Sequence, residues 1–155
     1  MQWTQSIDEY AAGPAQVARA VAGMTAQQLR ARPVAGKWST LEVVCHLADF
    51  EIVYADRLKR VLAENEPPLR GGDPSQFAAH LAYEARDLDE ELAVIDATRK
   101  QLARILRTLH PEDFERRGIH SEAGPITLGQ LLERITGHVP HHLRFIQEKR
   151  KALGL

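Results

Sequence analysis

The sequence predicts an all-α protein with the fold of a four-helix bundle. Apolar residues recur at helical spacing in four segments, and two capping boxes mark where two of the helices begin. No segment shows the sustained apolar-polar alternation that indicates a β-strand, so no strand is predicted. Amphipathic helices of this length bury their apolar faces most simply by packing side by side. With 155 residues, 44% of them hydrophobic, the chain is expected to form a single domain over residues 1–155.

The first helix is predicted over residues 5–23, with an interruption or restart at Gly13-Pro14. Thr25 is placed as the N-cap of a short helical turn, which must end before Pro33. The next residues, through Trp38, are expected to form a turn.

The second helix is predicted to begin at Ser39, which forms a capping box with Glu42, and to reach Glu64. Its buried face is marked by apolar residues three or four positions apart: Val43, Leu47, Phe50, Tyr54, Leu58 and Val61.

The third helical stretch is predicted from Asp73-Pro74 to Leu109, with a break near Arg86-Asp87. Residues 110–126 are predicted to form a long loop, and loops of this length in compact domains are often functional. The last helix begins at Thr127, which forms the second capping box with Gln130, and reaches about Ala152.

Charge and composition exclude several classes of protein. The chain carries 20 basic and 21 acidic residues, a formal net charge of -1, and only 6% aromatic residues, so no basic face is available for nucleic acid or an anionic membrane. No apolar run approaches the ~20 residues that span a bilayer, and the N-terminal residues do not resemble a signal peptide. The single cysteine, Cys45, fits a reducing compartment, and we predict a cytoplasmic protein.

The histidines indicate a metal site. His138 and His142 are four residues apart and continue the apolar stripe of the last helix, so both imidazoles reach one ion. His46 is the remaining histidine in the middle of a core-facing helix and is the predicted third ligand. His141 falls on a polar row of the last helix and is interpreted as flanking.

The other histidines and two carboxylates have different predicted roles. His80 and His110 are interpreted as structural, whereas His120 lies in the long loop and could approach the site. Asp49 is a candidate supporting partner of a ligand histidine or a fourth ligand. Asp49 and Glu51 are the candidate catalytic residues, as proton acceptors.

Three histidines with one open position are typical of catalytic rather than structural zinc, although imidazole also suits nickel, copper and iron. Cys45 adjoins His46 in the sequence but points about 100° away from it on a helix, so we interpret it as a small core residue.

Two runs of the sequence resemble signatures of the DinB-like superfamily of four-helix-bundle proteins. The first is Gly36-Lys37-Trp38-Ser39-Thr40-Leu41-Glu42-Val43-Val44-Cys45-His46-Leu47-Ala48-Asp49, and the second is Gly124-Pro125-Ile126-Thr127-Leu128-Gly129-Gln130-Leu131-Leu132 followed by His138 and His141-His142-Leu143. The resemblance implies a divalent metal ion, usually zinc or nickel, on His46, His138 and His142, and a homodimer. It also implies a relation to S-transferases and isomerases that use bacillithiol or mycothiol.

Several functions fit these observations. The leading hypothesis is a metal-dependent S-transferase, in which a low-molecular-weight thiol bound to the metal as its thiolate attacks a small electrophilic substrate. The second is a metal-dependent hydrolase of an amide or ester, with Asp49 or Glu51 accepting the proton. The third is a non-catalytic stress-response protein that binds a structural metal. A bundle without any metal is also compatible with the sequence.

Overall fold

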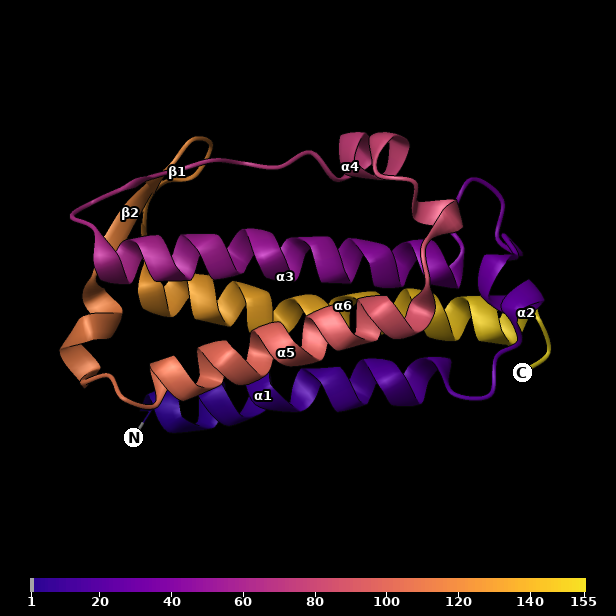
Figure 1. The fold of residues 1–155 in the computed structure, drawn as a ribbon, viewed down its shortest axis with the longest axis horizontal. Helices are drawn as coiled ribbons and strands as arrows, with labels where there is room; N and C mark the ends of the chain where they lie inside the picture. Colours follow the sequence, from indigo (N-terminus) through magenta and orange to yellow (C-terminus); the bar gives the residue numbers. More distant parts are fainter. Residues whose placement is uncertain (1) are drawn as a thin grey trace.

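Four long helices that lie side by side dominate the computed structural model, which describes residues 2–155 (Figure 1). They are α1 (Gln2–Val21), α3 (Thr40–Ala63), α5 (Leu88–Leu106) and α6 (Leu128–Ala152). α1 and α3 each pack against both α5 and α6. The predicted four-helix bundle is therefore confirmed.

The connection between α3 and α5 determines which parts of the helices meet. It contains strand β1 (Pro68–Leu69), helix α4 (Pro74–His80) and the 3-10 helix η1 (Tyr83–Ala85), and it returns along the whole length of α3 (Figure 1). As a result α3 and α5 run in the same direction, while α6 runs opposite to α3. The first half of α3 therefore lies beside the second half of α6.

Capping boxes begin helices α3 and α6 at the residues predicted for them. Ser39 Oγ accepts a hydrogen bond from Glu42 N, and Ser39 N donates to Glu42 Oε2. Thr127 and Gln130 form the same pair of bonds at the start of α6. Each box satisfies two backbone N–H groups that the helix itself leaves without partners. The short helix α2 (Ala26–Arg30) likewise begins at its predicted N-cap, Thr25.

The interruption predicted at Gly13-Pro14 is wrong, because α1 continues through both residues. Pro14 lacks the N–H that would bond to the Tyr10 carbonyl one turn earlier. Arg99 Nη1, from α5, donates to that carbonyl at 2.8 Å instead. Gly13 makes room for this contact, since a Cβ at this position would lie 2.0 Å from Arg99 Nη1.

The helical stretch predicted from Asp73 to Leu109 is divided into α4, η1 and α5. The break near Arg86-Asp87 is confirmed: Asp87 is the N-cap of α5, and its side chain accepts hydrogen bonds from the N–H groups of the next turn. A second break was not predicted. Ala82 there has a left-handed backbone with a φ of 51°, which separates α4 from η1.

The prediction that the chain has no strands is wrong. The segment predicted as a loop contains the 3-10 helix η2 (Pro111–Glu115), strand β2 (Arg117–His120) and strand β3 (Gly124–Thr127). β2 lies between β1, to which it is parallel, and β3, to which it is antiparallel. These strands have only two or four residues, too few for apolar-polar alternation to be recognised.

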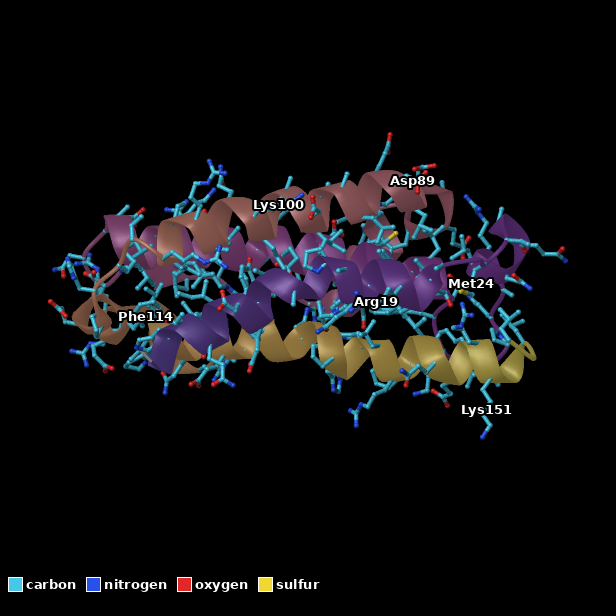
Figure 2. The ribbon with its side chains drawn as sticks, turned by 90° about the horizontal axis from the view of Figure 1, so that it is seen from below. Arg19, Met24, Asp89, Lys100, Phe114 and Lys151 are labelled. Carbon is cyan, nitrogen blue, oxygen red and sulfur yellow. The ribbon has the colours of Figure 1, made fainter. Side chains whose placement is uncertain are left out.

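The interior of the bundle is mostly apolar, and most polar side chains are directed outward. Figure 2 shows Asp89 and Lys151 projecting away from the bundle, while Phe114 lies against the helices. Phe114 is buried and stacks on Trp3 with ring centroids 4.5 Å apart, which closes the end of the core near the strands. No helix within residues 2–155 is long and apolar enough to cross a membrane.

A buried ion pair in the middle of the bundle joins all four long helices. Arg99 of α5 donates from Nε to Glu51 Oε1 of α3 at 2.8 Å. The same guanidinium donates to the Ile135 carbonyl of α6 at 3.0 Å, in addition to the Tyr10 carbonyl of α1. Arg99 and Glu51 are both buried almost completely. Because no water reaches this charge pair, its geometry constrains how the helices pack.

We predict that Glu51→Gln lowers the free energy of unfolding by about 3–5 kcal/mol, because it leaves the buried Arg99 charge without its counter-charge. Replacing both residues, with Glu51→Leu and Arg99→Met, should cost less than the two single changes added together. Chemical denaturation measures both effects. The exposed α5 pair Lys100–Asp96 is the control, and Asp96→Asn should change stability by less than about 1 kcal/mol. A similarly small effect of Glu51→Gln would contradict this account of the core.

Candidate metal centre

Three histidines from two helices meet at one point in the interior. His46 comes from α3, and His138 and His142 come from successive turns of α6. His46 Nε2 lies 2.9 Å from His138 Nε2 and 3.1 Å from His142 Nε2. The structure thus brings together the three residues predicted as ligands, which we call the histidine cluster. Within residues 2–155 it is the one group of three or more possible metal-ligating side chains with donor atoms this close.

Aromatic side chains surround the cluster. The ring of Trp38 lies 5.3 Å from that of His46, and the ring of Phe50 lies 4.6 Å from it. Burial among such neighbours lowers the pKa of His46 to about 4 and the pKa of both His138 and His142 to about 3. All three imidazoles are therefore neutral at pH 7, the form that binds a metal ion.

The arrangement of nitrogens fits one metal ion. Three nitrogens at about 2.1 Å from a tetrahedral ion are separated by about 3.4 Å, and the observed Nε2 separations of 2.9 and 3.1 Å are within a few tenths of an ångström of this. Converging neutral imidazoles cannot all donate to one another, so their lone pairs are available to a cation. Three protein ligands leave a fourth position open for water or substrate.

The Nδ1 atoms of the three histidines, which face away from the ion site, lack the carboxylate partner that was predicted for them. Nδ1 of His46, His138 and His142 is buried in each case without a hydrogen-bond partner among residues 2–155. Asp49, predicted to support or complete the site, instead forms two hydrogen bonds with Arg86, at 2.9 and 3.0 Å. Arg86 in turn binds Glu91 on α5. The structure therefore places Asp49 in an ion-pair network beside the cluster rather than within it.

Glu51, the second predicted proton acceptor, lies in the bundle core. Its carboxylate accepts hydrogen bonds from Arg99 and from the hydroxyl of Tyr10, the latter at 3.3 Å. This commits both of its oxygens to the helix-joining network. Neither Asp49 nor Glu51 is held as a free base next to the histidine cluster.

The remaining histidines mostly lie where they were predicted. His141 is exposed, and its Nδ1 lies 3.0 Å from Arg144 Nη2, outside the cluster. His80 is at the exposed end of α4, and His110 is the N-cap of η2. His120 is buried and lines the pocket around the cluster, but its Nδ1 accepts hydrogen bonds from two backbone N–H groups of the β2–β3 turn.

The cluster opens into a pocket of about 470 Å³ between α3 and α6. Aromatic residues Trp38, Phe50 and Tyr54 form part of its wall, and the loop at Gly71 and Gly72 borders it. Its polar lining, beyond the histidines of the cluster, consists of Arg57, His120, Glu122, Arg134 and His141.

Sequence reasoning missed the arginines of this pocket, although helical spacing contains the signal. Phe50, Tyr54 and Arg57 follow His46 by 4, 8 and 11 residues, which keeps them on one face of α3. Arg134 precedes His138 by one turn on α6.

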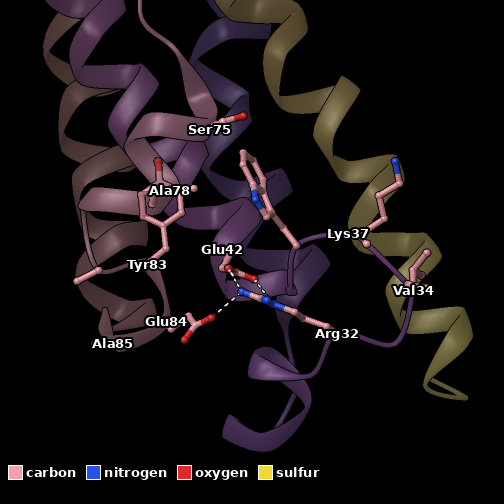
Figure 3. Close-up of a pocket in the computed structure, with 14 residues that line it drawn as sticks. Arg32, Val34, Lys37, Glu42, Ser75, Ala78, Tyr83, Glu84 and Ala85 are labelled. Carbon is pink, nitrogen blue, oxygen red and sulfur yellow. Dashed lines mark hydrogen bonds and ion pairs between the residues drawn. The ribbon is translucent and has the colours of Figure 1, made fainter.

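A second pocket, of about 790 Å³, lies on the other side of Trp38. Figure 3 shows Arg32 in this pocket, between the carboxylates of Glu42 and Glu84, and Arg32 Nη2 lies 2.6 Å from an oxygen of each. One guanidinium thus pairs with both carboxylates. Glu42 is also held by the capping box of α3, so its carboxylate is not free to act at the histidine cluster.

Cys45 is not a candidate nucleophile. Its side chain is fully buried, and its Sγ lies 3.6 Å from the Tyr83 carbonyl. Burial raises the pKa of the Cys45 thiol to about 12, so the reactive thiolate does not form at neutral pH. This confirms its interpretation as a core residue.

Comparisons with known proteins agree with this fold and include relatives that are provisionally named as metal-dependent. A family model for the DinB superfamily matches residues 9–146. YfiT from Bacillus subtilis, provisionally named a metal-dependent hydrolase, is 30% identical over 154 residues, which cover 99% of this chain and 85% of YfiT. A protein of Oceanobacillus iheyensis with the same provisional name is 30% identical over 145 residues, covering 94% of this chain and 82% of that protein.

Solved structures of other proteins have the same fold. The structure of YfiT, described as a four-helix bundle of unusual topology, matches with a TM-score of 0.90 at 29% identity and covers 97% of this chain and 87% of YfiT. A mycothiol-dependent maleylpyruvate isomerase matches with a TM-score of 0.71 at 11% identity, over 91% of this chain and 59% of the isomerase. The latter similarity is one of fold alone.

We predict that Cys45 does not react with Ellman's reagent in the native protein at pH 8, because its thiol is buried and protonated. Unfolding in guanidinium chloride should expose the single thiol of the chain to rapid reaction. Absorbance at the thionitrobenzoate band measures both rates, with Cys45→Ala as the blank. Rapid modification of the native protein would show that Cys45 is accessible and reopen it as a nucleophile.

Proposed function

Since this chain belongs to the DinB superfamily, and since its structure joins three neutral histidines at the end of a pocket, we propose that it is a metal-dependent enzyme. His46, His138 and His142 would hold one divalent ion, and the resemblance favours zinc or nickel. The convergence of the three Nε2 atoms is the observation that carries the proposal. A divalent ion in such a site polarises a carbonyl and lowers the pKa of a coordinated water or thiol.

We propose hydrolysis of an amide or ester as the reaction. The relatives that are about 30% identical over almost the whole chain are provisionally named metal-dependent hydrolases. The pocket supports this by its chemistry: Trp38, Phe50 and Tyr54 offer apolar surface to a small organic substrate, and the histidine cluster lies at the same cavity. The three imidazoles would present the open position toward that substrate.

Among residues 2–155, neither carboxylate predicted as a proton acceptor is free beside the cluster. Asp49 and Glu51 are both held by arginines, and Glu122 is the carboxylate that lines the pocket. Glu122 is exposed and pairs with no arginine or lysine of residues 2–155.

Thiol S-transfer is the second candidate, and the positions of Asp49 and Glu51 favour it. A thiol that binds a divalent ion loses its proton on binding, so transfer needs no neighbouring carboxylate. A buried, protonated Cys45 also means that the thiol would have to come from a small cofactor. Homodimer formation, a cytoplasmic location and a stress-response role remain predictions from the sequence and the resemblance.

We predict about one zinc or nickel ion per chain in protein purified without chelating resin, measured by elemental mass spectrometry. His46→Ala, His138→Ala and His142→Ala should each lose the ion, because each removes one of three ligands. His141→Ala should retain it, since His141 lies outside the cluster and contacts Arg144. Wild-type protein that is metal-free and cannot be loaded with either ion would refute the proposed metal site.

We predict that the metal-loaded protein hydrolyses activated amides or esters without added thiol, and that His138→Ala reduces this activity to background. A panel of 4-nitrophenyl esters and 4-nitroanilides, assayed with and without a small thiol such as cysteine, measures the effect by absorbance. Turnover that requires the thiol and yields a thiol adduct would reject hydrolysis in favour of S-transfer. Identical activity of the His138→Ala variant would assign the turnover to something other than this site.

A further inference from the structure

Arg57 is a buried cation without an anionic partner. Its residue is only 5% exposed, and it lines the pocket of the histidine cluster. Nε and Nη2 of its guanidinium donate to the Arg70 carbonyl at 3.2 and 2.6 Å. No carboxylate within residues 2–155 forms an ion pair with it. Arg99, the other buried arginine, has Glu51 as its counter-charge.

A charge in this position is costly unless an anion joins it. Burying a guanidinium removes its hydration, and the Arg70 carbonyl together with the Tyr54 ring, 4.8 Å from the guanidinium carbon, replaces only part of the lost interaction. Burial accordingly lowers the pKa of Arg57; Tyr54 and the Glu122 carboxylate oppose this shift, and the charge of Arg134 adds to it. The fold thus keeps two arginines and one exposed carboxylate, Glu122, at one end of the pocket, with a net positive charge.

His120 adds a hydrogen-bond donor to the same end. Its Nδ1 accepts from the backbone N–H groups of Glu122 and Ala123, both at 3.2 Å. The neutral imidazole must therefore carry its proton on Nε2. Arg57, His120 and Arg134 line the same pocket; burial lowers the pKa of His120, the two arginines lower it further, and Glu122 opposes them. We call Arg57, His120 and Arg134 the cationic end of the pocket.

The cationic end and the histidine cluster are separated by the length of a small molecule. Arg57 is eleven positions after His46 on α3, an axial rise of about 16 Å, whereas Arg134 is one turn, about 6 Å, from His138. Phe50 and Tyr54 line the pocket between the two ends of the α3 face. A ligand here would therefore have a charged end, an apolar middle and a reactive end.

We infer that the substrate is an amide or ester that carries a free carboxylate, which Arg57, Arg134 and His120 bind while the scissile carbonyl reaches the histidine cluster. This assignment rests on the proposed function for its reactive end, but its charged end follows from the arginines alone. Hydrolysis of such a substrate consumes one water. The C–N or C–O bond breaks, the acyl carbon gains the hydroxyl, and the amine or alcohol leaves with the proton.

The test measures binding separately from turnover. Isothermal titration of the protein as purified, with its metal content measured, compares 3-phenylpropionate with 3-phenylpropionamide. These probes have the same shape and differ in charge. We expect the carboxylate to bind at least about tenfold more tightly, as is typical when a hydrogen bond gains a full charge. Equal affinity for the two probes would overturn the inference.

Two substitutions locate the binding site. Arg134→Gln and Arg57→Gln should each weaken 3-phenylpropionate binding about tenfold or more and leave the amide unaffected. Arg60→Gln is the matched control: it removes the same charge from α3, but Arg60 pairs with Asp56 and Glu64 and does not line this pocket. Arg134 is exposed, so its variant tests the site even if Arg57→Gln fails to fold.

The outcomes distinguish this inference from the proposed function. A carboxylate held only by the metal would survive both arginine substitutions, and that result would overturn the cationic end as the recognition site. Arginine-dependent binding in a protein that hydrolyses neither neutral nor anionic esters would keep the anion site and reject the hydrolase. Equal turnover of anionic and neutral esters, without arginine dependence, would keep the hydrolase and reject the carboxylate.

Discussion

The bundle depends on one buried guanidinium. Arg99 contacts Glu51 of α3 and the backbone carbonyls of Tyr10 in α1 and Ile135 in α6, and it belongs to α5 itself. A charge without access to water must keep all of these partners, because losing one of them leaves a desolvated charge or carbonyl. The contact to Tyr10 also explains how α1 continues through Pro14, since Arg99 replaces the hydrogen bond that proline cannot donate. Apolar packing alone would allow the helices to slide, whereas these directional bonds determine their register.

This register of the helices brings the three histidines of the cluster together. Ile135, whose carbonyl accepts from Arg99, is one turn before His138 on α6, and Glu51 is just over one turn after His46 on α3. The network therefore joins both ligand-bearing helices within about one and a half turns of the cluster. Ligands that must meet to within tenths of an ångström need such support, because the Nδ1 atoms of the cluster have no hydrogen bonds within residues 2–155 to orient them. Packing by Trp38 and Phe50 orients the ring of His46 instead.

Local signals in the sequence were sufficient to predict the helices and the histidine cluster. They were not sufficient to predict the ion-pair partners of Asp49 and Glu51, which are far away in the sequence. The capping boxes at Ser39 and Thr127 act within four residues, and the pair His138 and His142 lies within one turn, so both could be predicted. The partners of Asp49 and Glu51 are 37 and 48 residues away, and no local pattern assigns Arg86 or Arg99 to them. The strands escaped prediction for a similar reason. They have two to four residues each, and β1 exists only through pairing with β2, about 50 residues later in the sequence.

The same strands complete the pocket. Because they supply part of the cationic end, that end was harder to predict from the sequence than the histidine cluster. The histidine cluster requires two helices, whereas the cationic end requires α3, α6 and the β2–β3 hairpin, which brings in His120. β2 is held by β1, next to Arg70, and the Arg70 carbonyl in turn holds the guanidinium of Arg57. The orientation of Arg57 thus depends on the segment that follows α3 as well as on α3 itself. A bundle of this kind can keep its cluster unchanged while substitutions in the connecting segments alter which group the far end of the pocket binds.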